Sequence, residues 1–370
     1  MKRYLIGVLS CPVCSGTPLQ LGVLCQQDEE IVDGILSCPS CGRKYPVEEG
    51  IPRMIPEGNE RTVEETAYQE VENATERKAG EIRKHLEVRQ ANIAYYDALD
   101  NTFDMDVAHA IYLNRFNQQR IASIIQDLSV KSSGYWFLDI GCGTGNVLRF
   151  GSNYFQHAVG IDVSINLLKL ANKQGMQVIQ ADVLSLPFSP NIFDVVSAFS
   201  VLHHIYDYPL VLKGASRILK KDGFLYTDWD PQKCFDTNSN LVLRAYGDIL
   251  YVLGRLRLLK SIDEQLWGSE VSRNMPDFRK DHPEFKDLHK LAEYHEQREK
   301  EERGLDPIGL KQTLLKVGFR TVDIKGSWHG KSFEELNISF LQRIQLRLKS
   351  RLSKQPIDRF MENIMVIAQK

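Results

Sequence analysis

The chain has 370 residues, and its 43% hydrophobic and 25% charged content is typical of a soluble globular protein and excludes wholesale disorder. Since domains commonly hold about 100–200 residues, this length predicts about two of them. With 46 Lys and Arg against 48 Asp and Glu, the net charge of −2 gives no overall attraction to nucleic acid or to an anionic membrane. The sequence also lacks the apolar run of about 18 residues that a membrane-spanning helix needs.

The first 57 residues contain two Cys-x-x-Cys pairs, Cys11 with Cys14 and Cys38 with Cys41, with 23 residues between the pairs. Four thiolates at this spacing predict a tetrahedral Zn²⁺ site in a reducing compartment rather than a disulfide framework. Because four protein ligands leave no open position for water or substrate, we expect a structural site.

Three other features of this segment matter. Residues 1–9 are predicted to form a strand, because their short apolar run does not fit a signal peptide. Cys25, between the pairs, is interpreted as a small buried hydrophobic residue rather than a fifth ligand. The segment holds five basic and seven acidic side chains, which disfavours binding to a phosphate backbone and favours a stabilising or docking module.

The remaining chain divides by composition. Residues 58–130 are rich in helix formers and predict a helical connector. From Tyr135 onward, short apolar runs alternate with amphipathic stretches, which is the pattern of a βαβ layer. The expected strands are 135–140, 158–163, 177–181, 193–199, 224–228, 321–324 and 363–368, and the expected helices are 166–172, 208–219 and 310–317. The alternation stops near Pro231 and resumes near residue 305, which indicates an insertion.

A glycine-rich turn, Gly141-Cys142-Gly143-Thr144-Gly145, follows the first of these apolar strands. Glycines let the backbone approach a ligand closely, and the helix start that follows favours an anionic group such as a carboxylate. The spacing is GxGxG, which differs from the GxGxxG of dinucleotide-binding folds.

Three carboxylates accompany this turn. Asp139 precedes it, Asp162 ends the second strand 21 residues after Gly141, and Asp182 follows the third strand. A carboxylate placed like Asp162 can accept hydrogen bonds from ribose hydroxyls. This acidic rim would repel a dinucleotide, whereas S-adenosylmethionine has no phosphate and carries a sulfonium and an ammonium. The alternative for Asp162 and Asp182 is a turn or helix cap.

Together, the segments LDIGCGTG, GIDVS, ADVLSLPFSPNIFDVV, SVLHHI and RILKKDGFLY resemble the class I S-adenosylmethionine-dependent methyltransferases. They are most similar to the methyltransferase type 11 branch, which includes the ubiquinone and menaquinone methylases. The resemblance covers about 136–230, with 305–325 and 360–369 matching more loosely. It implies a Rossmann-like, doubly wound α/β fold with a mostly parallel seven-stranded sheet, and it says little about the methyl acceptor.

The same resemblance implies the cofactor-binding residues. The methionine end would be held by Asp139, Gly141, Gly143 and Gly145, the ribose by Asp162, and the adenine by Asp182 and Val183. Ser200 would lie beside the cofactor after the fourth strand, and the set also includes Cys142 and Val163.

The N-terminal segment carries a second resemblance. With its ending DGILSCPSCGRKYPVEEGIPRMIPE, it is similar to the small zinc-ribbon activator of tRNA and protein methyltransferases, here joined to the catalytic part. In that family the ribbon packs on the catalytic partner and stabilises it, which implies the same role here.

Methyl transfer mainly requires that the nucleophile be aligned with the methyl group. A general base is needed only for a weakly acidic acceptor such as an alcohol or phenol. The candidates are His203 and His204 after the fourth strand, and Asp228, in the run Asp228-Trp229-Asp230, after the fifth. The histidines could instead cap the strand. Tyr95 and Tyr96 could cover the cofactor or serve aromatic packing.

Two basic amphipathic stretches, 241–260 and 341–354, carry four basic residues against one acid and five against none. They could form a lid that contacts a membrane surface or a lipid-like substrate. Ordinary lid helices with basic outer faces, or contact with RNA, would explain the same pattern.

The sequence thus predicts a zinc ribbon (1–57), a helical connector and cofactor cover (58–130), a methyltransferase core (131–230 and 305–370) and a helical lid (231–304). The expected activity is methyl transfer to a small-molecule or lipid-like acceptor in the cytoplasm, with peripheral membrane contact as an option and nucleic acid disfavoured. An RNA or protein methyltransferase that docks through its ribbon, and a non-catalytic cofactor-binding scaffold, remain open alternatives.

Overall fold

The computed structural model describes a subset of the chain, namely residues 1–55, 92, 93, 96, 115–205, 207–232, 304–327, 344, 347, 351 and 363–370. The predicted lid with its basic stretch 241–260 therefore lies almost entirely outside the described residues. The same holds for most of the connector, including Tyr95, and for all but three residues of 341–354.

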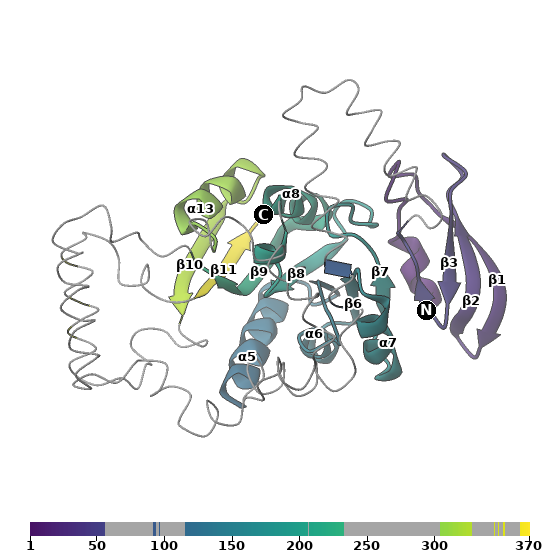
Figure 1. Ribbon diagram of the computed structural model, residues 1–370, viewed down its shortest axis with the longest axis horizontal. Helices are drawn as coiled ribbons and strands as arrows, with labels where there is room; N and C mark the ends of the chain where they lie inside the picture. The colour runs from purple at the N-terminus through teal and green to yellow at the C-terminus, as the bar shows by residue number, and fades with distance from the viewer. Residues whose placement is uncertain are drawn as a thin grey trace, which may run out of the picture.

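A seven-stranded sheet forms the centre of the molecule (Figure 1). Its strands are β5 (Trp136–Ile140), β6 (His157–Asp162), β7 (Val178–Gln180), β8 (Phe193–Phe199), β9 (Leu219–Pro231), β10 (Thr321–Ser327) and β11 (Asn363–Gln369). They lie in the order β10-β11-β9-β8-β5-β6-β7. The sheet is mostly parallel, because β11 alone runs antiparallel to its two neighbours.

Helices cover both faces of this sheet. Those on one face are α5 (Arg115–Lys131), α6 (Leu148–Tyr154) and α7 (Ile165–Lys173), and those on the other are α8 (Tyr208–Ile218) and α13 (Pro307–Lys316) (Figure 1). The strands β5 and β7 are buried at every residue, as expected of parallel strands covered on both sides. This arrangement confirms the predicted doubly wound, mostly parallel seven-stranded fold.

Local sequence explains where the helices begin. The Ser164 hydroxyl accepts from the Leu167 N–H at the start of α7, and the Asp207 carboxylate accepts from the Leu210 N–H at the start of α8. The Asp306 carboxylate does the same for α13, where Pro307 occupies the first helical turn. Each of these side chains satisfies backbone N–H groups that the helix itself leaves without partners. Within the described part of the chain, no helix is long and apolar enough to cross a bilayer.

The N-terminal unit is a small antiparallel sheet beside β7 (Figure 1). It consists of η1 (Arg3–Gly7), β1 (Gln20–Gln27), β2 (Glu30–Ser37), β3 (Lys44–Glu48) and β4 (Ile51–Pro52). The strand predicted for residues 1–9 is wrong, because η1 is a 3₁₀ helix. Leu5 and Leu9, four residues apart, are both fully buried, and helical geometry brings side chains at this spacing onto one side.

The N-terminal unit and the large sheet share one hydrophobic core. Leu5 and Leu9 belong to the same buried cluster as Phe188 and Val196. Backbone hydrogen bonds also join the two units, from Ser10 N to Pro187 O at 3.0 Å and from Met54 N to the carbonyl of the edge strand β7 at 2.7 Å. An uncovered edge strand is prone to unwanted pairing, so this contact protects the sheet.

The shared core can be tested with a matched pair of leucine substitutions. Leu9→Ala should lower the free energy of unfolding by about 2–5 kcal/mol, because it leaves a cavity between the two units. Leu24→Ala, at a side chain that is 74% exposed on β1, should have little effect. Urea unfolding followed by tryptophan fluorescence measures both. Equal, small effects of the two substitutions would contradict a continuous core.

Candidate functional site

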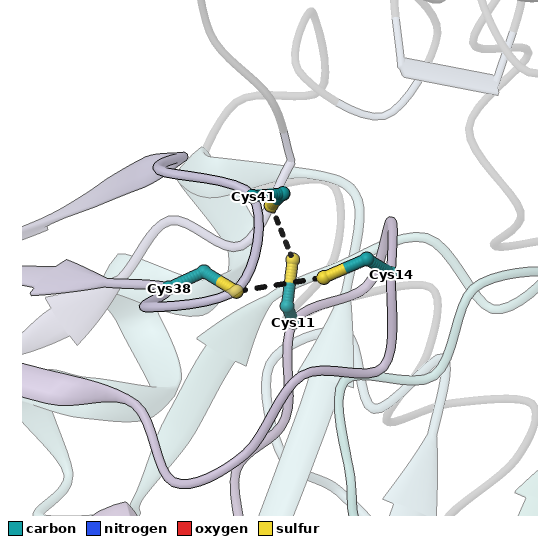
Figure 2. Close-up of side chains that lie close together, drawn as sticks. All are labelled: Cys11, Cys14, Cys38 and Cys41. Atoms are coloured by element: carbon teal, nitrogen blue, oxygen red, sulfur yellow. Dashed lines mark hydrogen bonds between the residues drawn. The ribbon is translucent and has the colours of Figure 1, made fainter.

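The four predicted metal-ligating cysteines lie together at one end of the N-terminal sheet (Figure 2). The Sγ atoms of Cys11 and Cys41 are 3.7 Å apart, and those of Cys14 and Cys38 are 3.5 Å apart. All four Sγ atoms lie within 4.8 Å of one another. Sulfur atoms about 2.3 Å from a tetrahedral Zn²⁺ would be about 3.8 Å apart, so this set could hold such an ion.

The two cysteine pairs have the same backbone geometry. In the first, Ser15 N donates to Cys11 O, and Cys11 N donates to Gly16 O; in the second, the bonds run from Gly42 N to Cys38 O and from Cys38 N to Arg43 O. The repeated pattern turns both thiols of each pair toward the same centre. Tyr45, which is fully buried, adds a hydroxyl 3.0 Å from the Cys11 Sγ, and such outer contacts orient metal ligands.

Cys25 differs from its prediction. It is exposed on β1, so the interpretation as a small buried hydrophobic residue is wrong. The error has a local cause, because β1 is an edge strand with nearly all of its residues exposed. Among the described residues, Cys25 is not part of the metal-ligating group.

The glycine turn lies between β5 and α6 in a conformation that ordinary residues avoid. Gly141, Gly143 and Gly145 have φ values of 65°, 51° and 89°. A Cβ atom on Gly141 would lie 2.5 Å from a methyl group of Val201, and one on Gly145 would lie 2.2 Å from the Met176 sulfur. The first contact also shows that the segment after β8, which leads to His203, packs directly against the turn.

The two acids predicted to bind ribose and adenine lie at adjacent strand ends. Asp162 accepts hydrogen bonds from Gly143 N and from Ser164 N, both at 2.9 Å. Asp182 accepts one from Leu184 N at 2.9 Å, and Val183 beside it is buried. Both acids therefore make the turn contacts of the alternative interpretation. Because a carboxylate offers about four acceptor positions, these contacts leave room for ligand hydroxyl or amino groups.

Asp139 lies deeper than a rim residue. It is 2% exposed, and its carboxyl accepts a 2.6 Å hydrogen bond from the Ser197 hydroxyl. Burial raises the pKa of Asp139 to about 7. Burial also raises the pKa of the Cys142 thiol, whose backbone N–H bonds to Ile161 O at 2.9 Å. Cys142 is thus a buried thiol within the turn.

The N-terminal unit reaches the adenine side of this site through a chain of hydrogen bonds. The Arg53 guanidinium donates to the Gln180 side-chain oxygen at 3.1 Å. The amide nitrogen of the same Gln180 side chain donates to Val163 O at 2.9 Å. The residue that follows Asp162 is therefore held in place by contacts that begin in the N-terminal unit.

The two candidate histidines have different partners. The Nδ1 atom of His203 is 2.9 Å from Asp230 Oδ1, and the same oxygen accepts the His203 backbone N–H at 3.1 Å. The Nε2 atom of His204 is 3.2 Å from the Tyr96 hydroxyl. The two imidazole rings stack with centroids 3.7 Å apart. Both lie in η3 (Leu202–His204), directly after the strand end that carries Ser200.

Asp228, the third catalytic candidate, is enclosed by internal partners. It is fully buried and forms a 2.7 Å ion pair with Arg120 of α5. It also accepts from the Tyr226 hydroxyl at 2.7 Å and from Trp229 N at 2.8 Å. Burial raises the pKa of Asp228 despite the neighbouring guanidinium. These contacts tie α5 to β9.

Sequence reasoning left two of these partners unidentified. Arg120 falls in the segment interpreted only as a helical connector, and nothing local links it to Asp228. Asp230 did stand in the run Asp228-Trp229-Asp230, but simple strand alternation would turn both acids to the same side. The described contacts show instead that they have separate partners.

Comparisons with known proteins agree with this geometry. A family model described as a methyltransferase domain matches residues 138–227, and one described as Trm112p-like protein matches residues 2–50. A demethylmenaquinone methyltransferase of Staphylococcus carnosus is 29% identical over 208 residues, which cover 53% of this chain and 79% of that protein. An uncharacterised protein of Methanocaldococcus jannaschii is 37% identical over 136 residues, or 36% of this chain.

The match spans only about half, 49%, of that archaeal protein. Among solved structures, a SAM-dependent methyltransferase of Thermotoga maritima aligns with a TM-score of 0.42 and 15% identity, covering 75% of this chain and 99% of that one. The two family matches confirm the predicted methyltransferase class and the predicted resemblance of the N-terminal segment to the methyltransferase activators.

The raised pKa of Asp139 should make stability depend on pH. Its carboxyl ionises near pH 4 in an unfolded chain but near pH 7 in the folded protein, so the folded state binds the extra proton between these values. The free energy of unfolding should therefore fall as pH rises from about 5 to 7.5, by an Asp139 contribution on the order of 3 kcal/mol. Asp139→Asn should remove this contribution. Denaturant unfolding of both proteins across the range measures it, and parallel curves would contradict the assignment.

Proposed function

Because the chain combines a methyltransferase domain with a Trm112p-like segment, we propose that it transfers the methyl group of S-adenosylmethionine to a small-molecule or lipid-like organic acceptor. The single observation that carries the cofactor assignment is the glycine turn with positive φ angles, flanked by Asp139, Asp162 and Asp182 at three neighbouring strands. In open α/β sheets, ligands bind outside the carboxyl ends of the strands.

Each part of the cofactor has a chemical counterpart in this set. Asp162 has remaining acceptor positions for the two ribose hydroxyls, and Asp182 with Val183 offers an acceptor beside an apolar surface, which suits the adenine amino group and ring. Gly141, Gly143 and Gly145 permit close approach of the methionine end. Cys142, Val163 and Ser200 complete the proposed contact set from the turn and the adjacent strand ends.

The acceptor class is proposed from the relatives and from the chemistry of the cleft. Several relatives of similar length are named demethylmenaquinone methyltransferases, whose acceptors are lipid-like. The N-terminal unit is already packed on the large sheet of its own chain, which supports a stabilising role for it. This packing, with its unfavourable charge for phosphate backbone, argues against RNA as the first choice.

Of the three catalytic candidates, His203 suits a general base best. Asp228 already interacts with Arg120, Tyr226 and the Trp229 backbone, and His204 contacts Tyr96. His203 uses one ring nitrogen for Asp230, while its side chain remains 21% exposed. It can therefore offer the other nitrogen to an acceptor.

We also assign Zn²⁺ to Cys11, Cys14, Cys38 and Cys41. Four thiolates fit a tetrahedral zinc ion, and such a closed set supplies stability rather than chemistry. The ion would fix the two cysteine turns relative to β1–β3, and through them the core that the N-terminal unit shares with the sheet.

The proposed activity can be tested with methyl-labelled S-adenosylmethionine, the full chain and an extract of the source organism. Label should appear in the organic-soluble fraction. Label confined to RNA or to protein would overturn the acceptor class, and cofactor binding without any transfer would indicate a non-catalytic scaffold.

The ribose assignment predicts a specific loss of affinity. Asp162→Ala should weaken S-adenosylmethionine binding by about tenfold or more, because it removes charged hydrogen bonds of about 1.5–3 kcal/mol. Asp222→Ala, which removes an exposed carboxylate from β9, is the matched control and should bind normally. Isothermal titration measures both dissociation constants. Equal affinities would refute the role of Asp162.

The zinc assignment predicts a defined metal content. The purified chain should contain one Zn²⁺, and Cys14→Ser should lose it and melt at lower temperature, because metal binding and folding are coupled. Cys25→Ser is the control, since Cys25 is exposed and outside the ligand group. Elemental analysis and thermal unfolding measure these outcomes. Full zinc content in the Cys14→Ser variant, or unchanged melting after confirmed zinc loss, would contradict the assignment.

A further inference from the structure

The two acids at the end of β9 are separated by an irregularity in the strand. Opposite β11, Thr227 pairs with Val366 and Asp230 pairs with Ile364. Two residues of β9, Asp228 and Trp229, therefore face the single residue Met365, which defines a β-bulge. Trp229 has a φ of 62°, a value that a bulky side chain rarely adopts.

This bulge gives Asp230 a direction that a regular strand would not. Without the extra residue, Tyr226, Asp228 and Asp230 would all point to the same face. Tyr226 and Asp228 do share partners on the α5 side, where Arg120 neutralises the carboxylate. Asp230 instead contacts His203 in η3. Bulges beside functional sites commonly re-aim a side chain in this way.

The buried charge of Asp230 has one available counterion. The side chain is 0% exposed, and its Oδ2 atom has no hydrogen-bond partner among the described residues. Within the same part of the chain, His203 is the basic side chain that contacts Asp230. A buried carboxylate requires compensation by an opposite charge. Asp230 is therefore placed to stabilise His203 when that ring carries a second proton.

From this geometry we propose that Asp230 is a positioning residue for His203, and that the pair accepts a proton from a weakly acidic hydroxyl acceptor, so that the enzyme is an O-methyltransferase. This inference rests on the proposed function. Asp230 would fix the Nδ1–H tautomer of His203 and leave the Nε2 lone pair toward the acceptor. Val201, two residues earlier, packs against Gly141, so η3 borders the proposed cofactor turn.

The reaction balances with these groups alone. The acceptor oxygen attacks the methyl carbon, and the carbon–sulfur bond breaks with its electron pair remaining on sulfur. The products are a methyl ether or ester and the neutral thioether S-adenosylhomocysteine. The acceptor's proton passes to His203 Nε2, and the positive charge that the sulfonium loses appears on the imidazolium beside Asp230.

One experiment identifies the bond that receives the methyl group. The wild-type chain is incubated with methyl-labelled S-adenosylmethionine and the organic-soluble fraction of source extract, and the product is treated with hydriodic acid. Label on oxygen should be released as volatile methyl iodide. Label that stays attached to carbon or nitrogen would overturn the hydroxyl acceptor while leaving the proposed methyltransferase function intact.

Variants then test the role of Asp230. Asp230→Asn preserves the shape and removes the charge, and it should slow transfer by about 100-fold or more while cofactor affinity stays unchanged. Asp222→Asn, an exposed carboxylate on the same strand, should transfer normally. Wild-type transfer by Asp230→Asn would show that Asp230 only caps η3, and would overturn the proposal.

A spectroscopic readout separates positioning from simple structural support. The chain is labelled with ¹⁵N in its nine histidines, and His203→Gln identifies the His203 signals. The neutral ring of His203 should be protonated on Nδ1 in the wild type, and Asp230→Ala should abolish this preference. An Nε2-protonated ring in the wild type would overturn the pair. If no methyl transfer occurs at all, the proposed function fails, and this measurement still decides the Asp230–His203 contact.

Discussion

The compensation of buried carboxylates is the constraint on which the rest of the site depends. Asp139, Asp162, Asp228 and Asp230 lie at or near the carboxyl ends of β5, β6 and β9, where little water reaches them. A carboxylate in such a place must be protonated, hydrogen-bonded or paired with a cation. The structure uses all three solutions, and each solution gives its residue a different chemical character.

These characters separate support from chemistry. The carboxyl of Asp139 has a pKa raised to about 7 and a serine hydroxyl beside it, so it is suited to donate as well as accept hydrogen bonds. Asp162 is satisfied by backbone N–H groups of the glycine turn and of α7, which couples that turn to the proposed ribose contact. Asp228 is paired with Arg120 and anchors a helix. Asp230 is left with a histidine, which can gain or lose its charge near neutral pH.

The N-terminal unit contributes to the same site from outside. It covers the edge strand β7, shares a core with the sheet, and holds the backbone of Val163 through Arg53 and Gln180. Joining the two units in one chain makes this contact intramolecular, so it does not depend on concentration as a separate partner would. Loosening the cysteine turns should therefore be felt at the cofactor side of the sheet.

The sequence by itself determined the features that depend on neighbouring residues: the four-cysteine spacing, the GxGxG turn, the strand-end acids and nearly every described strand and helix of the large sheet. Its local errors were residues 1–9, where a spacing of four between Leu5 and Leu9 indicated a helical turn, and Cys25 on an exposed edge. The tertiary structure alone decided that Arg120 pairs with Asp228, that Leu9 packs with the core of the sheet, and that the bulge at Trp229 turns Asp230 toward His203. The reason is physical: periodicity and turn chemistry are local, whereas the direction of a side chain and its charge partner depend on how distant strands and helices pair.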